Sequence, residues 1–187
     1  GKEALDCFYH MQCMNVQPNA ITYTCCLKAC GSVKDISKGR ELHALILQQE
    51  LLGKNAIICN ALIEMYARCG CLEKAREIFN KIAIPDIVCW NAMIACYVRQ
   101  HQGERALEMF DKMQNEHLHP DEATFTSILS ACADMEVLPK GMLIHRYAAN
   151  YGFDSNIGIL HALIHMYGNC GKLDEAQALF DHIKAKE

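Results

Sequence analysis

The chain has 187 residues, of which 51% are hydrophobic, and its formal net charge is −4 at pH 7. This length suits one domain or a short repeat array, and no apolar run reaches the roughly 18 residues that a membrane-spanning helix requires. The acidic balance argues against a non-specific nucleic-acid binder, which is usually basic, although it does not exclude a local basic stripe.

The sequence begins at Gly1 rather than Met and shows no signal or transit peptide, so we expect a segment of a longer protein. Its twelve cysteines lie inside helical patterns, as Cys30, Cys96 and Cys132 do. Disulfide frameworks are typical of small, loop-rich secreted proteins. We therefore expect nearly all of these cysteines to be small buried residues in a reducing compartment.

Four helical phrases recur 101 or 102 residues downstream, and such spacing is the mark of a repeat array. A shorter period lies inside this one, because a helix of the form A-x-x-x-F appears four times and three of the four prolines fall in matching places. The four phrases are "KEALDCFYHM" (2–11) with "ERALEMFDKM" (104–113), "ITYTCCLKAC" (21–30) with "ATFTSILSAC" (123–132), "NALIEMYARCG" (60–70) with "HALIHMYGNCG" (161–171), and "LEKAREIFNKI" (72–82) with "LDEAQALFDHI" (173–183).

The prolines mark unit boundaries, because proline ends helices and does not continue them. Each unit is predicted to form two amphipathic helices, and strand patterns are absent. A glycine-containing turn at Gly70, Gly103 or Gly171 is expected between the two helices. The predicted boundaries give a partial unit at 1–19 and full units at 20–55, 56–86, 87–121, 122–156 and 157–187.

Two short helices cannot bury their apolar faces alone, so neighbouring units must stack. The predicted fold is therefore all-α, a right-handed α-solenoid of stacked helix–turn–helix units. A single irregular helical bundle is the alternative. The residues expected to form the buried face of unit 56–86 are Leu62, Met65, Tyr66 and Cys69 in its first helix and Leu72, Ala75, Ile78, Phe79 and Ile82 in its second.

The phrase "DIVCWNAMIACYVR…G…ALEMFDKM…HPD" (86–121) resembles a pentatricopeptide repeat, whose pattern is V-x-Y-N-x-L-I…G…A-x-x-x-F-x-x-M…G-x-x-P-D. The resemblance covers the whole chain. The strict length and the W-x-x-L-G-x-x-Y opening of tetratricopeptide repeats are missing. The alternating unit lengths, with "GRELH" (39–43) and "GMLIH" (141–145), resemble the plant P-L-S branch. In those terms 1–19 is a partial P-type unit, 20–55 and 122–156 are L-type, 56–86 and 157–187 are S-type, and 87–121 is P-type.

This resemblance implies a fold built from helical pairs that binds single-stranded RNA, read at one base per repeat. The family reads with the fifth and the last residue of each unit, and its second residue is an apolar wedge between bases. The implied reading pairs are Thr24 with Asn55, Asn60 with Asp86, Asn91 with Asp121, Thr126 with Asn156, and His161 with Glu187, and Asn19 is the last residue of the partial unit.

An asparagine amide offers a donor and an acceptor, whereas an aspartate carboxylate only accepts and can therefore orient the amide. The family associates the Asn/Asp pair with uracil, sometimes with cytosine, so the adjacent units 56–86 and 87–121 imply a U-U step. The threonine pairs belong to L-type units, where the code is weak. The pair of His161 with Glu187 departs from the usual combinations and receives no base.

The implied base-wedging residues are the β-branched Ile21, Ile57 and Val88, and the same position holds the poorer wedges Ala123 and Gly158. The thirteenth residue of each unit is a candidate phosphate contact. Only the two Asn/Asp units have an arginine there, and the five residues are Ser32, Arg68, Arg99, Asp134 and Asn169. We therefore expect RNA contact to centre on 56–121.

Several of these residues have structural alternatives. Asp86 and Asp121 follow proline before a helix, where aspartate is a common cap, and capping and base contact are compatible. The equivalent His43 and His145 are expected to be structural, and Trp90 to pack between helices rather than on RNA. The cysteines at 25, 26, 30, 69 and 71 match no structural zinc pattern, so we expect core packing and no metal or cofactor.

The chain lacks the H-x-E and C-x-x-C signature of zinc deaminases, so no catalytic residue is assigned and an enzyme domain would lie outside it. The predicted function is sequence-selective RNA binding, as the targeting array of an RNA-editing or RNA-processing factor in a mitochondrion or chloroplast. The expected partners are an organellar transcript and proteins of an editing complex, with no membrane and no small-molecule substrate. The alternative is a protein-binding helical scaffold that acts through its L-type repeats.

Overall fold

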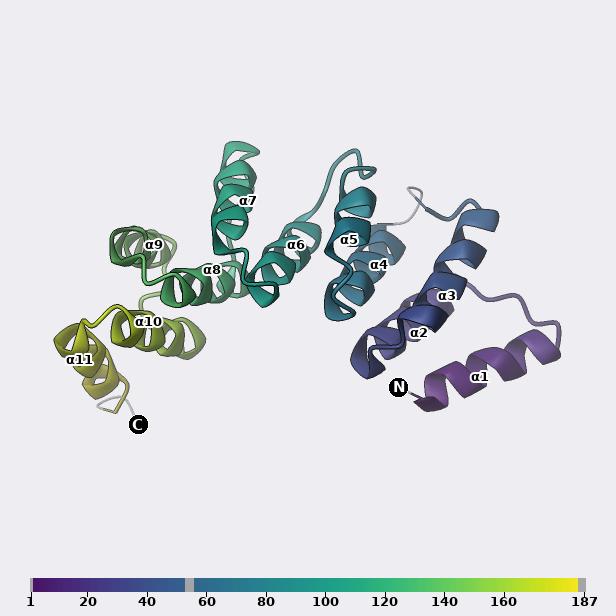
Figure 1. Cartoon of the computed structure of the whole chain (residues 1–187), viewed down its shortest axis with the longest axis horizontal. Helices are drawn as coiled ribbons and strands as arrows, with labels where there is room; N and C mark the ends of the chain where they lie inside the picture. Colours follow the sequence, from purple (N-terminus) through teal and green to yellow (C-terminus); the bar gives the residue numbers. More distant parts are fainter. Residues whose placement is uncertain (1, 53–55, 185–187) are drawn as a thin grey trace. The chain divides into compact units, whose positions relative to one another are not determined.

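A computed structural model of the chain describes residues 2–52 and 56–184. This part of the chain contains eleven α-helices and no strand, which confirms the all-α prediction (Figure 1). The helices fall into two compact units, one ending at Cys96 and the other beginning at Tyr97. The boundary lies inside helix α6.

The first unit contains α1 (Lys2–Cys13), α2 (Ala20–Val33), α3 (Ile36–Gln48), α4 (Ala56–Arg68), α5 (Leu72–Phe79) and most of α6 (Ile87–Arg99). Helix α2 packs side by side with α4, α1 packs on α2, α3 packs on both α2 and α4, and α5 packs on α4 (Figure 1). Because α2 and α4 each have neighbours on more than one side, their apolar residues form the centre of the core.

The second unit contains α7 (Gly103–Asn115), α8 (Glu122–Asp134), α9 (Leu138–Asn150), α10 (Ile157–Asn169) and α11 (Leu173–Lys184). Helix α8 packs against α10, α9 packs on both, α7 packs on α8, and α11 packs on α10. Helices α8 to α11 therefore repeat the packing of α2 to α5, as the sequence recurrence predicts.

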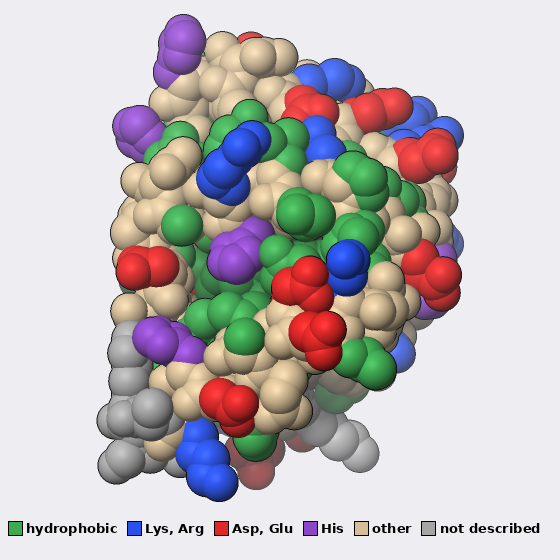
Figure 2. Space-filling model, turned by 90° about the vertical axis from the view of Figure 1, so that its left-hand side faces the viewer, with side chains coloured by type: hydrophobic (Ala, Val, Ile, Leu, Met, Phe, Trp, Pro, Cys, Tyr) green, Lys and Arg blue, Asp and Glu red, His purple; other side chains and the backbone are tan. Residues whose placement is uncertain are grey.

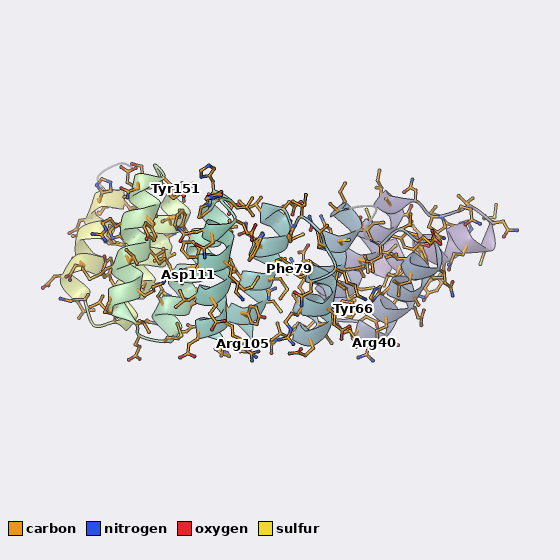
Figure 3. The ribbon with its side chains drawn as sticks, turned by 90° about the horizontal axis from the view of Figure 1, so that it is seen from above. Arg40, Tyr66, Phe79, Arg105, Asp111 and Tyr151 are labelled. Carbon is orange, nitrogen blue, oxygen red and sulfur yellow. The ribbon has the colours of Figure 1, made fainter. Side chains whose placement is uncertain are left out.

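Helix α4 shows how the helical period becomes a core. Leu62, Met65 and Tyr66 recur at three- and four-residue spacing and are all buried. Trp90 of α6 is also buried, as predicted, and meets Phe79 edge to face with ring centroids 5.0 Å apart (Phe79 is labelled in Figure 3). Trp90 is therefore a packing residue of the first unit.

The tight turns between helices differ in part from the prediction. Gly70 and Gly171 adopt φ angles of +74° and +73°, a left-handed conformation that favours glycine. Gly103 was wrongly predicted to be a turn residue. It is the first residue of α7, and His101 takes the positive φ of +53° in that turn. A Cβ at 103 would lie 2.5 Å from the sulfur of Met135, so a larger residue there would require the Met135 side chain to shift.

All twelve cysteines are free thiols, but the predicted burial is wrong for six of them. Cys7 and Cys13 in α1 and Cys25 in α2 are exposed. Cys69, Cys71 and Cys170 are half-buried next to the ends of helices. The prediction of burial is confirmed for Cys30, Cys96 and Cys132, which lie in the core together with Cys26, Cys59 and Cys89.

The end of the second unit exposes apolar side chains. Figure 2 shows apolar side chains gathered on the face that is at the left in Figure 1. In α11, Leu173 is 70% and Phe180 is 53% exposed. Their counterparts in the first unit, Leu72 and Phe79, are buried. The same sequence phrase is therefore core in one unit and surface in the other. Within the described residues, no helix has the length and apolarity needed to cross a membrane.

Candidate functional site

The first unit brings together the predicted pair Asn60 and Asp86, which are 26 residues apart in sequence. Asn60 lies in the second turn of α4, and Asp86 lies immediately before α6. The Asn60 Nδ2 atom donates to both carboxylate oxygens of Asp86, at 3.3 Å to Oδ1 and 3.2 Å to Oδ2. The carboxylate therefore orients the amide directly, without a bridging side chain.

Asp86 also caps helix α6. The backbone N–H of Cys89 donates to Asp86 Oδ1 at 2.9 Å, which satisfies one of the free donors of the first helical turn. Partial burial by itself raises the pKa of the Asp86 carboxyl, but hydrogen bonds from the Cys89 N–H and the Asn60 amide outweigh burial and hold the pKa below its ordinary value. The carboxylate is thus ionised at neutral pH and accepts from two sides.

A third side chain completes this cluster, and the sequence analysis did not single it out. The thiol of Cys89 is buried and donates to Asn60 Oδ1, so the amide is held at both its nitrogen and its oxygen. The available signal was the residue type, since the third position holds cysteine in the predicted unit 87–121 but isoleucine, Ile58 and Ile159, in the predicted units 56–86 and 157–187.

The predicted wedge residues are large apolar side chains in solvent. The three residues are the second residues of α2, α4 and α6. The side chains of Ile21, Ile57 and Val88 are 73%, 62% and 54% exposed. Ala123 is exposed as well. Gly158 lies against Glu122, whose Oε1 would be only 2.4 Å from a Cβ at that position. The first unit therefore carries three exposed β-branched residues in equivalent places, and the second unit has none at 123 or 158.

The threonines predicted as readers bond to their own helices. Thr24 Oγ1 donates to the Ala20 carbonyl at 2.8 Å, and Thr126 Oγ1 donates to the Glu122 carbonyl at 2.8 Å. Asn156 caps α10 by accepting from the Ile159 N–H at 3.0 Å, and its Nδ2 donates to Glu122 Oε2 at 2.8 Å. The structure thus joins Asn156 to Glu122, a partner that the sequence analysis missed, and gives no hydrogen bond between Asn156 and Thr126.

Three further reading pairs stay predictions: Asn91 with Asp121, Thr24 with Asn55, and His161 with Glu187. Asn91 lies in the first unit and Asp121 in the second, so their pairing stays a prediction. Asp121 caps α8 by accepting from the Thr124 N–H at 2.9 Å, with Thr124 closing a capping box. Asn55 and Glu187 lie outside the described residues. His161 is exposed on α10.

The two arginines predicted to contact phosphate differ in their surroundings. Arg68 forms an ion pair with Glu64 one turn earlier on α4, with Nη2 2.8 Å from Glu64 Oε1. Arg99 is exposed in the last turn of α6, and no ion pair to it occurs among the described residues. The charge of Arg68 is thus partly offset within its own helix. At the other thirteenth positions, Ser32 Oγ donates to the Ala29 carbonyl, Asp134 lies 4.0 Å from His101, and Asn169 Nδ2 donates to the Ala133 carbonyl.

The two equivalent histidines make the same contact in the two units. His43 Nδ1 lies 2.9 Å from the Tyr66 hydroxyl, and His145 Nδ1 lies 2.9 Å from the Tyr167 hydroxyl. Burial lowers the pKa of both histidines below the ordinary value. His43 therefore links α3 to α4, and His145 links α9 to α10. No cluster of three or more potential metal ligands occurs in residues 2–52 and 56–184.

The sequence of this chain matches models of a known helical repeat. A model of the PPR repeat family matches residues 85–134, and a model of the PPR repeat matches residues 57–83 and 159–187. The Arabidopsis thaliana pentatricopeptide repeat-containing protein CRR2, chloroplastic, is 36% identical over 100% of this chain. A second chloroplastic pentatricopeptide repeat-containing protein of the same plant is 38% identical over 92% of the chain. The chain spans only 29% and 28% of these two relatives.

The fold is similar to solved structures. The crystal structure of the pentatricopeptide repeat protein PPR10 in complex with an 18-nt psaJ RNA element matches 99% of this chain and 27% of that protein, with a TM-score of 0.82 at 22% identity. The structure of PPR10 from maize matches 95% of the chain and 26% of that protein, with a TM-score of 0.70 at 20% identity. This likeness supports the predicted α-solenoid of stacked helical pairs.

Proposed function

The chain belongs to the pentatricopeptide repeat family, and from that premise we propose that it binds single-stranded RNA sequence-selectively, one base at each repeat. The repeat units are those predicted above, of the P-L-S class, with the boundaries at 19/20, 55/56, 86/87, 121/122 and 156/157. PPR10, whose crystal structure contains an RNA element, has the same fold and supports this proposal.

One observation in the first unit carries the proposal. Asn60 and Asp86 form a hydrogen-bonded pair beside two β-branched side chains, Ile57 and Val88, that are 62% and 54% exposed. Exposed aliphatic side chains of this size add nothing to the core. A base stacked between them would cover their apolar surface, and stacking of a base is worth roughly 1–3 kcal/mol in single-strand binders.

The base assigned to this pair is uracil. With Asp86 accepting from one Nδ2 proton, the Asn60 amide still offers the other Nδ2 proton and a lone pair of Oδ1. Uracil presents an N3–H donor beside a carbonyl acceptor and matches that pattern. Unit 87–121, with Asn91 and Asp121, is assigned the second uracil of a U-U step. Arg68 and Arg99 are assigned to backbone phosphate.

The L-type surfaces favour a second function. The hydroxyls of Thr24 and Thr126 are engaged with their own helices, and the Asn156 amide is engaged by Glu122. These positions offer little for reading a base. We assign the L-type repeats a lesser part in RNA binding, with contact to partner proteins as the candidate alternative function of the chain.

The biological setting proposed is an organelle, either chloroplast or mitochondrion, where the chain acts as the targeting array of an RNA-editing or RNA-processing factor. The relatives named as chloroplastic proteins support the organellar assignment. The chain itself is assigned no catalytic step. Chemistry on the transcript and contact with editing-complex proteins are proposed for the whole protein and not for this chain.

The test is fluorescence anisotropy with short RNAs that differ only at a central U-U, C-C or A-A step. We expect U-U to bind best, and Asn60→Ala/Asn91→Ala to lower U-U affinity about tenfold or more, since it removes hydrogen bonds worth roughly 0.5–1.5 kcal/mol each. The matched control is Asn80→Ala/Asn115→Ala, because Asn80 and Asn115 are exposed at the ends of α5 and α7. Equal binding of all three RNAs would refute base reading, and a loss caused equally by the control would refute the assigned site.

A further inference from the structure

The Asn60 amide has two fixed neighbours rather than one. Its Nδ2 atom faces the Asp86 carboxylate, and its Oδ1 atom faces the thiol of Cys89, which is 1% exposed. Cys89 also donates its backbone N–H to Asp86 at 2.9 Å, so the two side chains that contact the amide are joined to each other at the start of α6. Asn60, Asp86 and Cys89 are called the reader cluster below.

The protonation states of the reader cluster define which atoms donate. Burial, reinforced by the nearby Asp86, raises the pKa of the Cys89 thiol to about 12, so the thiol keeps its proton at neutral pH and acts as an S–H donor. Asp86 is ionised and only accepts. If the amide rotated by 180°, Oδ1 would face the carboxylate and Nδ2 would face the thiol proton. The contact between Oδ1 and the carboxylate would be unfavourable, and the thiol would lose Asn60 as an acceptor and keep only Asp86.

The orientation of this amide decides which pyrimidine it matches. Uracil presents an acceptor at O4 and a donor at N3, whereas cytosine presents a donor at N4 and an acceptor at N3. For a base held in one place by Ile57 and Val88, the two pyrimidines require opposite orders of Oδ1 and Nδ2. An amide free to flip accepts both bases, and an amide held in one orientation accepts one.

We propose that Cys89 is a specificity-determining positioning residue: its S–H group reinforces the orientation that the Asp86 carboxylate gives to the Asn60 amide, and so strengthens the separation of uracil from cytosine at unit 56–86. This inference rests on the proposed RNA-binding function and deepens it. Packing alone does not require a cysteine there, because Ile58 and Ile159 occupy the same third position in other units and are fully buried.

The experiment uses two variants of the same residue. Cys89→Ala removes the donor, and Cys89→Ser restores a donor of similar reach. The matched control is Cys96→Ala, since Cys96 is a buried cysteine two turns further along α6. Affinities are measured for RNAs that carry U-U, C-U or U-C at the central step. In parallel, the side-chain amide resonances of Asn60 are followed by NMR in the RNA-free protein.

We expect Cys89→Ala to lower the uracil-to-cytosine affinity ratio about three- to tenfold at one of the two positions, which corresponds to the loss of one hydrogen bond. Binding of U-U over A-A should persist, because a donor and an acceptor remain. Cys89→Ser should restore the ratio, and Cys96→Ala should leave it unchanged. The Asn60 amide resonances should shift in Cys89→Ala and not in Cys96→Ala.

The outcomes separate this inference from the function on which it rests. A wild-type chain that prefers U-U, with a ratio that Cys89→Ala does not change, would overturn the role of Cys89 alone. Unshifted Asn60 resonances in Cys89→Ala would also overturn it, whatever the RNA result. A wild-type chain that binds no RNA would overturn the proposed function itself, and the NMR comparison would still decide whether Cys89 holds the amide.

Discussion

Replacing Phe79 by alanine removes a ring that the first unit buries at the end of α5. Phe79 is 9% exposed and packs edge to face on Trp90, with ring centroids 5.0 Å apart. Phe180 occupies the same place in the repeated phrase of α11 but is 53% exposed. We therefore expect Phe79→Ala to destabilise this chain strongly and Phe180→Ala to destabilise it weakly.

The magnitudes follow from burial. A buried phenylalanine-to-alanine change costs about 3–5 kcal/mol, including the cavity that it leaves, and an aromatic pair contributes about 0.5–1.5 kcal/mol of such a total. Because Phe79 is slightly open to solvent, we expect a loss of about 3–4 kcal/mol. Phe180 buries about half of its ring and leaves an open depression rather than a cavity, so we expect roughly 1–1.5 kcal/mol.

Urea unfolding of the wild type and both variants, followed by circular dichroism, measures the two losses. Because Trp90 is the single tryptophan of the chain, its fluorescence separately reports the first unit. Phe79→Ala should shift both signals to lower urea, and Phe180→Ala should leave the fluorescence transition in place. Equal losses for the two variants, or a larger loss for Phe180→Ala, would refute the assignment of Phe79 to the core and Phe180 to the surface.

Three other predictions address the polar contacts. Asp86→Ala should lower the free energy of unfolding by about 1 kcal/mol through loss of the α6 cap. Because the folded state depresses the pKa of this carboxyl, its contribution to stability should be present above about pH 5 and fade as the pH falls below the ordinary 3.8. Urea titrations at pH 7 and pH 3 that gave the same loss of stability would contradict this prediction. Burial lowers the pKa of His43 and His145 below 6.5, so the unfolded chain binds more protons and the free energy of unfolding should fall between pH 7 and pH 5.5. Changing both histidines to glutamine should flatten this pH dependence of stability. An unaltered pH dependence would exclude these histidines as its source. Glu64→Gln should free the Arg68 guanidinium and raise RNA affinity about two- to fivefold at low salt, less at high salt, whereas an unchanged affinity at 50 mM salt would argue against Arg68 as a phosphate contact.

Much of the fold was predictable because it depends on periodic signals. Apolar residues at helical spacing, as in Leu62, Met65 and Tyr66, must face a core in any helix. The recurrence at 101 and 102 residues then required the second unit to repeat the packing of the first. The errors fall where the local pattern was ambiguous. Gly103 looked like a turn residue, but it begins α7 and the side chain of Met135 lies close to it.

The candidate site was predictable in part. The partners Asn60 and Asp86 could be named from their places in the repeat, and the structure joins them by hydrogen bonds. The contacts of Cys89 with Asn60 and of Glu122 with Asn156 could not. Each depends on where one side chain meets another across a turn or between helices, and no spacing rule contains that information.

The sequence by itself determined the helical period, the pairing of helices into repeats and the residue types at the reading positions, because these depend on local spacing and on recurrence along the chain. Only the tertiary structure decided that Phe79 is core while Phe180 is surface, and that the Asn60 amide is held by a carboxylate and a thiol. Burial and amide orientation depend on what a neighbouring helix places against a side chain. Two similar phrases can therefore have different surroundings in one chain.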